Sequence, residues 1–248
     1  MRNIMIKIEY DGTNYNGWQI QPNGITIQGE IKKALKKLTG EDLNINGSGR
    51  TDAKVHARGQ VANFYTASNI PVGGFARAIN HFLPQDIAVL EAKEVSKDFH
   101  ARYWAEGKMY GYQLYIYPQR SPLLRNHSYH ITYELDIAKI EEAVKLFIGT
   151  HDFKAFMSSG SSVKSTIRTI KHIKLERQGH CIWLEFEGNG FLYNMVRIIV
   201  GTLVEIGSGK RDLEIVKKAL ETGDRRNAGH LAPPQGLFLE KVFYPLTH

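Results

Sequence analysis

Runs of alternating apolar and polar residues recur along this chain, and several neighbouring runs are separated by too few residues to hold a helix. Residues 169–176 and 182–187 form one such pair, and residues 108–117 form a longer run that places Tyr110, Tyr112, Leu114 and Ile116 on one side. Alternation with a period of two predicts half-buried β-strands. Because strands joined this closely lack a crossover helix, we expect them to pair antiparallel.

The first 40 residues predict a strand followed by a helix. Apolar residues alternate along residues 4–10, which predicts a strand that ends in the turn at Asp11-Gly12. Thr26 is placed to cap a helix whose apolar positions recur at helical spacing along residues 27–38. Gly40 is placed to end that helix, since glycine readily takes the left-handed conformation found at helix ends.

The remaining pattern predicts an α+β fold. Further strands are expected at residues 43–48, 60–65, 87–95, 108–117, 169–176, 182–187 and 237–244. Further helices are expected from Pro71 towards Pro84, from Asp136 to Gly149, from about residue 191 to 206, and after Asp212. The similar order of elements in both halves predicts two similar lobes, residues 1–105 and 106–248, each a mostly antiparallel sheet packed with helices.

Composition narrows the class of protein. The 248 residues are 42% hydrophobic, enough to bury a core, and the net charge of +7 allows a polyanionic partner. A merely solubilising basic surface is equally compatible with that charge. Cys181 is the only cysteine, so no intrachain disulfide or cysteine-based metal cluster can form. With no signal-peptide pattern and no apolar run near the roughly 20 residues of a membrane helix, we expect a soluble, cytoplasmic protein.

A polar segment between two predicted strands carries most of the residues suited to chemistry. Residues 47–60 read GSGRTDAKVHARGQ. Arg50 and Arg58 can contact phosphates or stack on a base, and Asp52 supplies a carboxylate. On the pattern alone, Asp52 can equally accept local backbone hydrogen bonds in a hairpin loop, so both interpretations stay open at this point.

Five blocks in order resemble one enzyme family. Residues 49–57, GRTDAKVHA, resemble the signature of the TruA-type tRNA pseudouridine synthases, whose aspartate is catalytic. The other four blocks are YDGTNYNGW at 10–18 with Gln28, GTHDF at 149–153 with Phe156 and RTI at 168–170, GFLYNMVR at 190–197 with GTL at 201–203, and APPQGL at 232–237. The resemblance implies a pseudouridine synthase fold with a central RNA-binding cleft, and the isomerisation of uridine to pseudouridine in RNA.

The resemblance also implies roles for particular residues. Asp52 is expected to be the nucleophile and Arg197 its partner. An ion pair between them, at ~4 Å and an effective dielectric near ~20, is worth about 4 kcal/mol before desolvation is subtracted. Tyr110 is expected to stack on the target base. Packing explains Arg197 and Tyr110 as well, the first as a snorkelling end of an apolar helix and the second as an ordinary strand tyrosine.

Substrate-binding residues are expected around the same loop. The resemblance gives Arg50 a part in displacing the flipped base, and Arg58 and His56 are further candidates, although His56 suits packing as well as contact with RNA. Lysines 32, 33, 36 and 37 lie on the polar face of the first predicted helix, where a solvated face is the simpler explanation. Nothing is oxidised in the implied reaction, and the sequence shows no dinucleotide-type glycine loop and no convincing metal-ligand cluster, so neither a cofactor nor a metal is expected.

The implied substrate is tRNA at positions 38 to 40, in the anticodon stem and loop, bound by a homodimer. Two positions depart from the family pattern, Lys54 where glycine is usual and Gly111 where a basic residue is usual, so the exact target is less firmly implied than the reaction.

Two other functions are the alternatives, a non-catalytic RNA-binding protein and a nucleoside or glycoside hydrolase. A glycoside hydrolase normally requires a second acid. Whether Asp52 attacks C6 of uracil or C1′ of ribose stays open.

Overall fold

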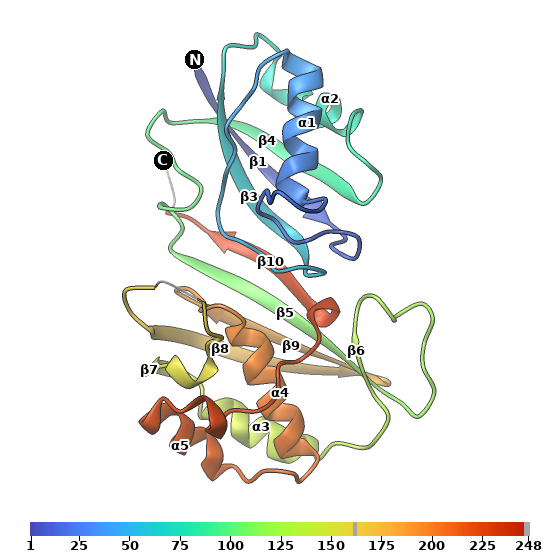
Figure 1. The fold of residues 1–248 in the computed structure, drawn as a ribbon, viewed down its shortest axis with the longest axis vertical. Helices are drawn as coiled ribbons and strands as arrows, with labels where there is room; N and C mark the ends of the chain where they lie inside the picture. Colours follow the sequence, from blue (N-terminus) through green and yellow to red (C-terminus); the bar gives the residue numbers. More distant parts are fainter. Residues whose placement is uncertain (161–162, 246–248) are drawn as a thin grey trace. The chain divides into compact units, whose positions relative to one another are not determined.

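The computed structural model describes residues 1–160 and 163–245 (Figure 1). The chain divides into two compact units. The first comprises Met1–Glu106 with the described residues from Phe238 onward, and the second comprises Gly107–Leu237. Both units combine mostly antiparallel strands with helices, which confirms the expected α+β class.

In the first unit the strands are ordered β4-β1-β3-β10, with β2 paired to β3. Their bounds are β1 (Arg2–Tyr10), β2 (Asn46–Gly47), β3 (His56–Thr66), β4 (Ile87–Val95) and β10 (Leu237–Phe243). β1 pairs antiparallel with β3 and with β4. β10 runs parallel to β3, where Phe238 lies opposite His56 and Leu239 opposite Ala57. The last strand of the chain thus returns to the unit that holds the first.

Two helices complete the first unit. Helix α1 (Ile27–Thr39) and helix α2 (Val72–Asn80) lie side by side, and α2 also packs against β4 (Figure 1). The Thr26 hydroxyl accepts from the Gly29 N–H at 3.3 Å, and Gly40 takes a φ of 76°. These are the cap and the end predicted for α1. Ile4, Ile6 and Ile8 of β1 are fully buried, so the strand lies in the core of the unit.

In the second unit the strands are ordered β5-β9-β8-β7, with β6 paired to β5. Their bounds are β5 (Gly107–Ile116), β6 (Tyr129–Ile131), β7 (Gly149–Asp152), β8 (Ile167–Gln178) and β9 (Cys181–Gly188). The helices are α3 (Ile137–Lys145), α4 (Met195–Gly207) and α5 (Glu214–Thr222), with short 3-10 turns at Lys154–Phe156, Arg225–Asn227 and Pro234–Gly236. Every residue of α4 is buried, and α3 packs against it.

Several boundaries differ from those expected. The strand expected at residues 43–48 is reduced to Asn46–Gly47, and β3 begins four residues earlier than expected, at His56, because its first residues pair with β10. Gly149 begins β7 instead of ending α3. The N-cap of α5 is Leu213 and not Asp212. The expected lobes also assigned β10 to residues 106–248, since chain order gives no signal of a strand that rejoins an earlier sheet.

Among the described helices, none combines the length and the apolar character needed to cross a lipid bilayer.

Candidate functional site

The expected site residues fall in both units. Arg50, Asp52, His56 and Arg58 belong to the first unit, where they precede or begin β3. Tyr110 on β5 and Arg197 on α4 belong to the second.

The loop that carries Asp52, residues 48–55, is bound to the chain segment that follows β1. The Trp18 N–H donates to the Thr51 carbonyl at 3.0 Å, and the Lys54 N–H donates to the Tyr15 carbonyl at 3.2 Å. The Val55 N–H donates to the Asp52 carbonyl at 3.2 Å and closes a tight turn. The backbone is therefore fixed on both sides of Asp52, whose side chain stays partly exposed.

Two glycines allow this close approach. A Cβ on Gly12 would lie 2.0 Å from the Val55 carbonyl oxygen, and a Cβ on Gly17 would lie 2.4 Å from the Thr51 carbonyl oxygen. Both distances are too short for any side chain. Gly17 also has a φ of 85°, a conformation that favours glycine. The block YDGTNYNGW that resembles the family thus includes both glycines as well as Tyr15 and Trp18, which bond to the loop.

Gln60 fixes the start of the loop from inside the core. Its side chain is fully buried. The Ser48 hydroxyl donates to Gln60 Oε1 at 2.6 Å, and Gln60 Nε2 donates to the Gly49 carbonyl at 3.0 Å. Buried polar groups that are satisfied in this way make an arrangement rigid. The sequence pattern did not single out Gln60, because a glutamine in an apolar strand carries no signal of its partner.

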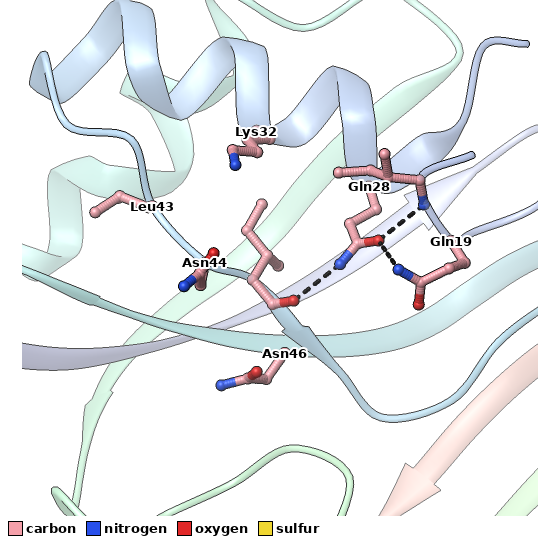
Figure 2. Close-up of a pocket in the computed structure, with 8 residues that line it drawn as sticks. Gln19, Gln28, Lys32, Leu43, Asn44 and Asn46 are labelled. Carbon is pink, nitrogen blue, oxygen red and sulfur yellow. Dashed lines mark hydrogen bonds between the residues drawn. The ribbon is translucent and has the colours of Figure 1, made fainter. Parts of the chain in front are cut away.

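A second glutamine joins the residues before the loop to α1 (Figure 2). Gln28 Oε1 accepts from Gln19 Nε2 at 2.9 Å and from the Ile20 N–H at 3.0 Å, and its Nε2 donates to the Ile45 carbonyl at 2.9 Å. The amide thereby joins three segments of the first unit. These side chains border a polar pocket lined by Gln19, Ile20, Gln28, Lys32, Leu43, Asn44, Ile45 and Asn46.

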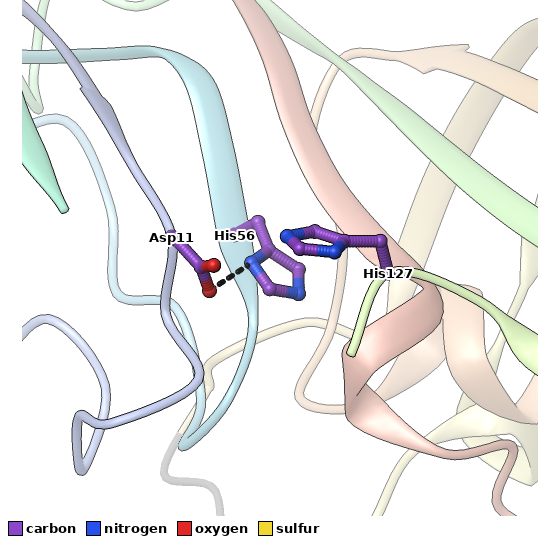
Figure 3. Close-up of side chains that lie close together, drawn as sticks. All are labelled: Asp11, His56 and His127. Carbon is purple, nitrogen blue, oxygen red and sulfur yellow. Dashed lines mark ion pairs between the residues drawn. The ribbon is translucent and has the colours of Figure 1, made fainter. Parts of the chain in front are cut away.

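His56 is packed inside the first unit, and its side chain is only 1% exposed. Figure 3 shows its ring directed toward Asp11. Nδ1 lies 3.1 Å from Asp11 Oδ1 and 3.0 Å from the Gly12 N–H, which donates to it. The ring also stacks on Phe238, with centroids 4.7 Å apart. A ring this buried offers almost no surface to an RNA, and its contacts link β3 to the Asp11-Gly12 turn.

The two arginines near Asp52 differ in their surroundings. Arg58 packs its guanidinium 4.7 Å from the centroid of the Phe238 ring and forms an ion pair with Glu240 at 2.9 Å. His56 and Arg58 therefore meet on the same phenyl ring. Arg50 is exposed and lies in the loop that carries Asp52, two residues before it.

In the second unit Tyr110 is almost buried, with 9% of its surface exposed. Its ring meets Phe191 edge to face, with centroids 5.2 Å apart. Such a contact favours one ring orientation. The tyrosine is thus held in place by the residues that precede α4.

Arg197 lies in the first turn of α4 and is only 9% exposed, so it is not a snorkelling side chain. Its Nε donates to the Ala232 carbonyl at 2.8 Å, and its Nη1 donates to Asn194 Oδ1 at 2.8 Å. Asn194 has a φ of 62° and binds Ser158 Oγ through its Nδ2. Because the donors of a guanidinium lie in one plane, these two bonds fix the plane of the Arg197 side chain.

Within the separate units, the sequence blocks thus provide a carboxylate on a braced turn and an arginine with a fixed orientation. A carboxylate of this kind can act as a nucleophile or a general base. Asn194 and Ala232 were not expected as partners of Arg197, although both lie in the blocks GFLYNMVR and APPQGL that resemble the family.

Comparisons with known proteins give the family. The family model described as tRNA pseudouridine synthase matches residues 6–104 and 143–245. The tRNA pseudouridine synthase A of Acetivibrio thermocellus is 51% identical over 244 residues, which are 98% of this chain and all of that protein. The tRNA pseudouridine synthase A 2 of Clostridium perfringens is 50% identical with the same coverage.

Among solved structures, an H/ACA RNP bound to a substrate RNA containing 2′-deoxyuridine is similar with a TM-score of 0.40 and 12% identity, over 81% of this chain and 43% of the other. A likeness of that degree is too low to imply a shared function, so the family follows from the sequence matches. With a family model that covers most of its length and relatives about half identical from end to end, the chain belongs to the tRNA pseudouridine synthases.

Proposed function

We propose that the chain isomerises uridine to pseudouridine in tRNA, with Asp52 as the nucleophile. The observation that carries this proposal is the identity of about half of all residues with tRNA pseudouridine synthases of nearly the same length. The braced turn at residues 51–55 supports it, because a nucleophile must be held in one geometry to be effective.

The reaction leaves the elemental composition of the nucleoside unchanged. The Asp52 carboxylate adds to an electrophilic carbon of the base or the ribose, and the bond between N1 and C1′ breaks. The base rotates, C5 bonds to C1′, and Asp52 leaves. The hydrogen on C5 is lost to solvent while N1 gains a proton, so no oxidant and no energy source enter.

Asp52 has to be ionised for the first step. A free aspartate has a pKa of about 3.9, and a site that excludes water raises this value unless a cation compensates. By family resemblance Arg197 supplies that cation. Its fixed guanidinium plane suits the role, since a partner that needs no reordering stabilises charge at little entropic cost. The pairing of Arg197 with Asp52 stays a prediction.

The target uridine has to leave its stack, at a cost of a few kcal/mol. Arg50 is the residue proposed to fill the space that the base vacates, and its exposure at the edge of the loop leaves it able to reach RNA. Tyr110 is proposed to stack on the flipped base. Arg58 can contact phosphate only in competition with Glu240, and His56 is proposed to act through packing.

The substrate region and the assembly are part of the proposal. We propose the anticodon stem and loop of tRNA as the target, a central RNA-binding cleft, a homodimer, and a cytoplasmic location. The net charge of +7 supports an RNA partner. Binding should therefore weaken steeply as salt is raised, because phosphate contacts release counterions.

The test uses tRNA transcripts with tritium on C5 of uracil and measures the label released to water. The variants are Asp52→Asn, which keeps the shape of the side chain, and Asp42→Asn, a control at an exposed carboxylate of the same unit. We expect release by the wild type and by the control, and none by Asp52→Asn with tRNA binding retained.

Two other outcomes would reject the proposal. Binding of tRNA without release from any transcript, by a folded wild type, indicates a non-catalytic RNA-binding protein. Release of free uracil indicates a hydrolase that cleaves the bond between N1 and C1′ without forming the new one.

A further inference from the structure

One segment of the second unit lies along α4 and binds it at three points. This segment, residues 228–233, precedes the 3-10 turn that leads to β10. The Gly229 N–H donates to Thr202 Oγ1 at 2.8 Å, and the His230 N–H donates to Glu205 Oε1 at 3.1 Å. Ala232 forms the third point, since its N–H donates to the Arg197 carbonyl at 3.2 Å and its carbonyl accepts from Arg197 Nε at 2.8 Å.

The contact is close because both sides carry glycine. A Cβ on Gly201 would lie 1.9 Å from the His230 carbonyl oxygen, and a Cβ on Gly229 would lie 2.5 Å from the Thr202 Cα. The backbone of the segment therefore lies directly on the helix. A small displacement at one of the three points has to be transmitted to the others.

Glu205 is the only charged residue of α4 besides Arg197, and its side chain is just 7% exposed. Burying a carboxylate costs several kcal/mol unless it is paired. Oε1 accepts from the His230 ring Nδ1 at 3.0 Å as well as from the His230 N–H, and Oε2 accepts from Arg211 Nε at 2.6 Å. His230 Nε2 in turn lies 3.2 Å from the Tyr129 hydroxyl. The carboxylate is thus the centre of a satisfied network.

We infer that Glu205 is a positioning residue for Arg197: by binding His230, it sets the position of the Ala232 carbonyl that holds the Arg197 guanidinium. The consequence for catalysis rests on the proposed function, in which Arg197 acts beside the nucleophile. Thr202 and Glu205 hold one end of the segment, and Arg197 binds the other. The orientation of the guanidinium then depends on a carboxylate two helical turns further along α4.

The experiment compares Glu205→Gln with Glu214→Gln, a control that removes an exposed carboxylate of the same unit paired to Lys217 at the surface. Glutamine keeps the size of the side chain and removes its charge. Two readouts are taken. The first is kcat and KM for tritium release from tRNA, and the second is hydrogen exchange of the Arg197 Nε–H by NMR, assigned with Arg197→Lys.

We expect Glu205→Gln to lower kcat about tenfold, as small misplacements of catalytic groups do, with KM unchanged. We expect its Arg197 Nε–H to exchange faster, because the bond to Ala232 is weakened. The control should match the wild type in both readouts. If Glu205→Gln does not fold, His230→Phe serves instead. This variant keeps an aromatic ring at position 230 and leaves the bond from Arg211 to the Glu205 carboxylate in place.

The inference is overturned if a folded variant keeps the wild-type exchange rate at Arg197, whatever its activity. It is also overturned if the exchange rate rises and kcat stays at the wild-type value. A failure of the proposed function is a different result, because it appears as the absence of tritium release from the wild-type protein. The exchange readout needs no reaction and still tests the link between Glu205 and Arg197.

Discussion

The hydroxyl of Tyr10 lies 2.7 Å from the Oγ1 of Thr51, the residue that precedes Asp52. Both side chains are buried. Burial raises the pKa of Tyr10 above its ordinary value, so the phenol stays neutral and hydrogen-bonded under physiological conditions. The last residue of β1 thereby contacts the turn that carries the proposed nucleophile.

Removal of this hydrogen bond should affect activity as well as stability. We expect Tyr10→Phe to lower the free energy of unfolding by about 1 kcal/mol and to leave the Thr51 hydroxyl without its partner. Turnover of tRNA should fall because the turn at Asp52 loses one of its constraints. The control is Tyr65→Phe, which removes an exposed tyrosine hydroxyl bound to the Lys97 carbonyl. Equal turnover in the two variants would contradict the prediction.

Two glycines with similar backbone angles should respond differently to substitution. Gly17 has a φ of 85° and Gly40 a φ of 76°, so alanine is strained at both. A Cβ at position 17 would also meet the Thr51 carbonyl at 2.4 Å, whereas nothing lies within 4 Å of a Cβ at position 40. We expect Gly40→Ala to lower only the free energy of unfolding, by about 1 kcal/mol, and Gly17→Ala to lower turnover as well.

The measurement is urea unfolding together with tritium release, each at a temperature where the variants are folded. If Gly17→Ala matches Gly40→Ala in turnover, the contact between residue 17 and the loop has no part in placing Asp52.

Local signals predicted the elements that depend on local physics. The cap at Thr26 and the left-handed Gly40 follow from the chemistry of helix ends, and both were found where the sequence predicted them. The strand Ile87–Val95 has the predicted bounds. For this strand the alternation of hydrophobic residues is sufficient, because burial of one face decides the structure.

Contacts between distant residues could not be predicted in this way. The pairing of Phe238 with His56 joins residues far apart in the chain, and it moved the start of β3 into the expected loop. The bond from Arg197 to Ala232 depends on how a segment without regular structure lies along α4. The family resemblance identified the blocks that contain Arg197 and Ala232, but the residue pattern does not say which of their atoms form hydrogen bonds.

Lys54 provides a test of backbone strain next to the proposed nucleophile. Its φ is 65°, in the left-handed region that costs residues with a Cβ about 1 kcal/mol. We expect Lys54→Gly to unfold at higher urea concentration than Lys54→Ala, because both remove the charge and only glycine relieves the strain. If alanine is as stable as glycine at this position, the turn does not impose the left-handed conformation in solution.

The stability of the second unit should depend on pH through Glu205. Hydrogen bonds from His230 and Arg211 outweigh burial and hold the pKa of this carboxyl below its ordinary value of 4.5. A group whose pKa is lower in the folded state stabilises the fold above its unfolded pKa, and this contribution is lost as the pH falls through the folded pKa. Its contribution is therefore complete near neutral pH and decreases in acid.

Other carboxyl groups, among them Glu41 and Asp224, also have pKa values below their ordinary values, so the wild type alone cannot isolate Glu205. The quantity to measure is the difference in unfolding free energy between the wild type and Glu205→Gln, by urea unfolding at several pH values from neutral to about pH 3. We expect this difference to be constant above about pH 5 and to shrink below it, because only the wild type can take up the proton. If the difference does not change down to about pH 3, the pKa of Glu205 is the same in the folded and the unfolded protein, and the prediction is wrong.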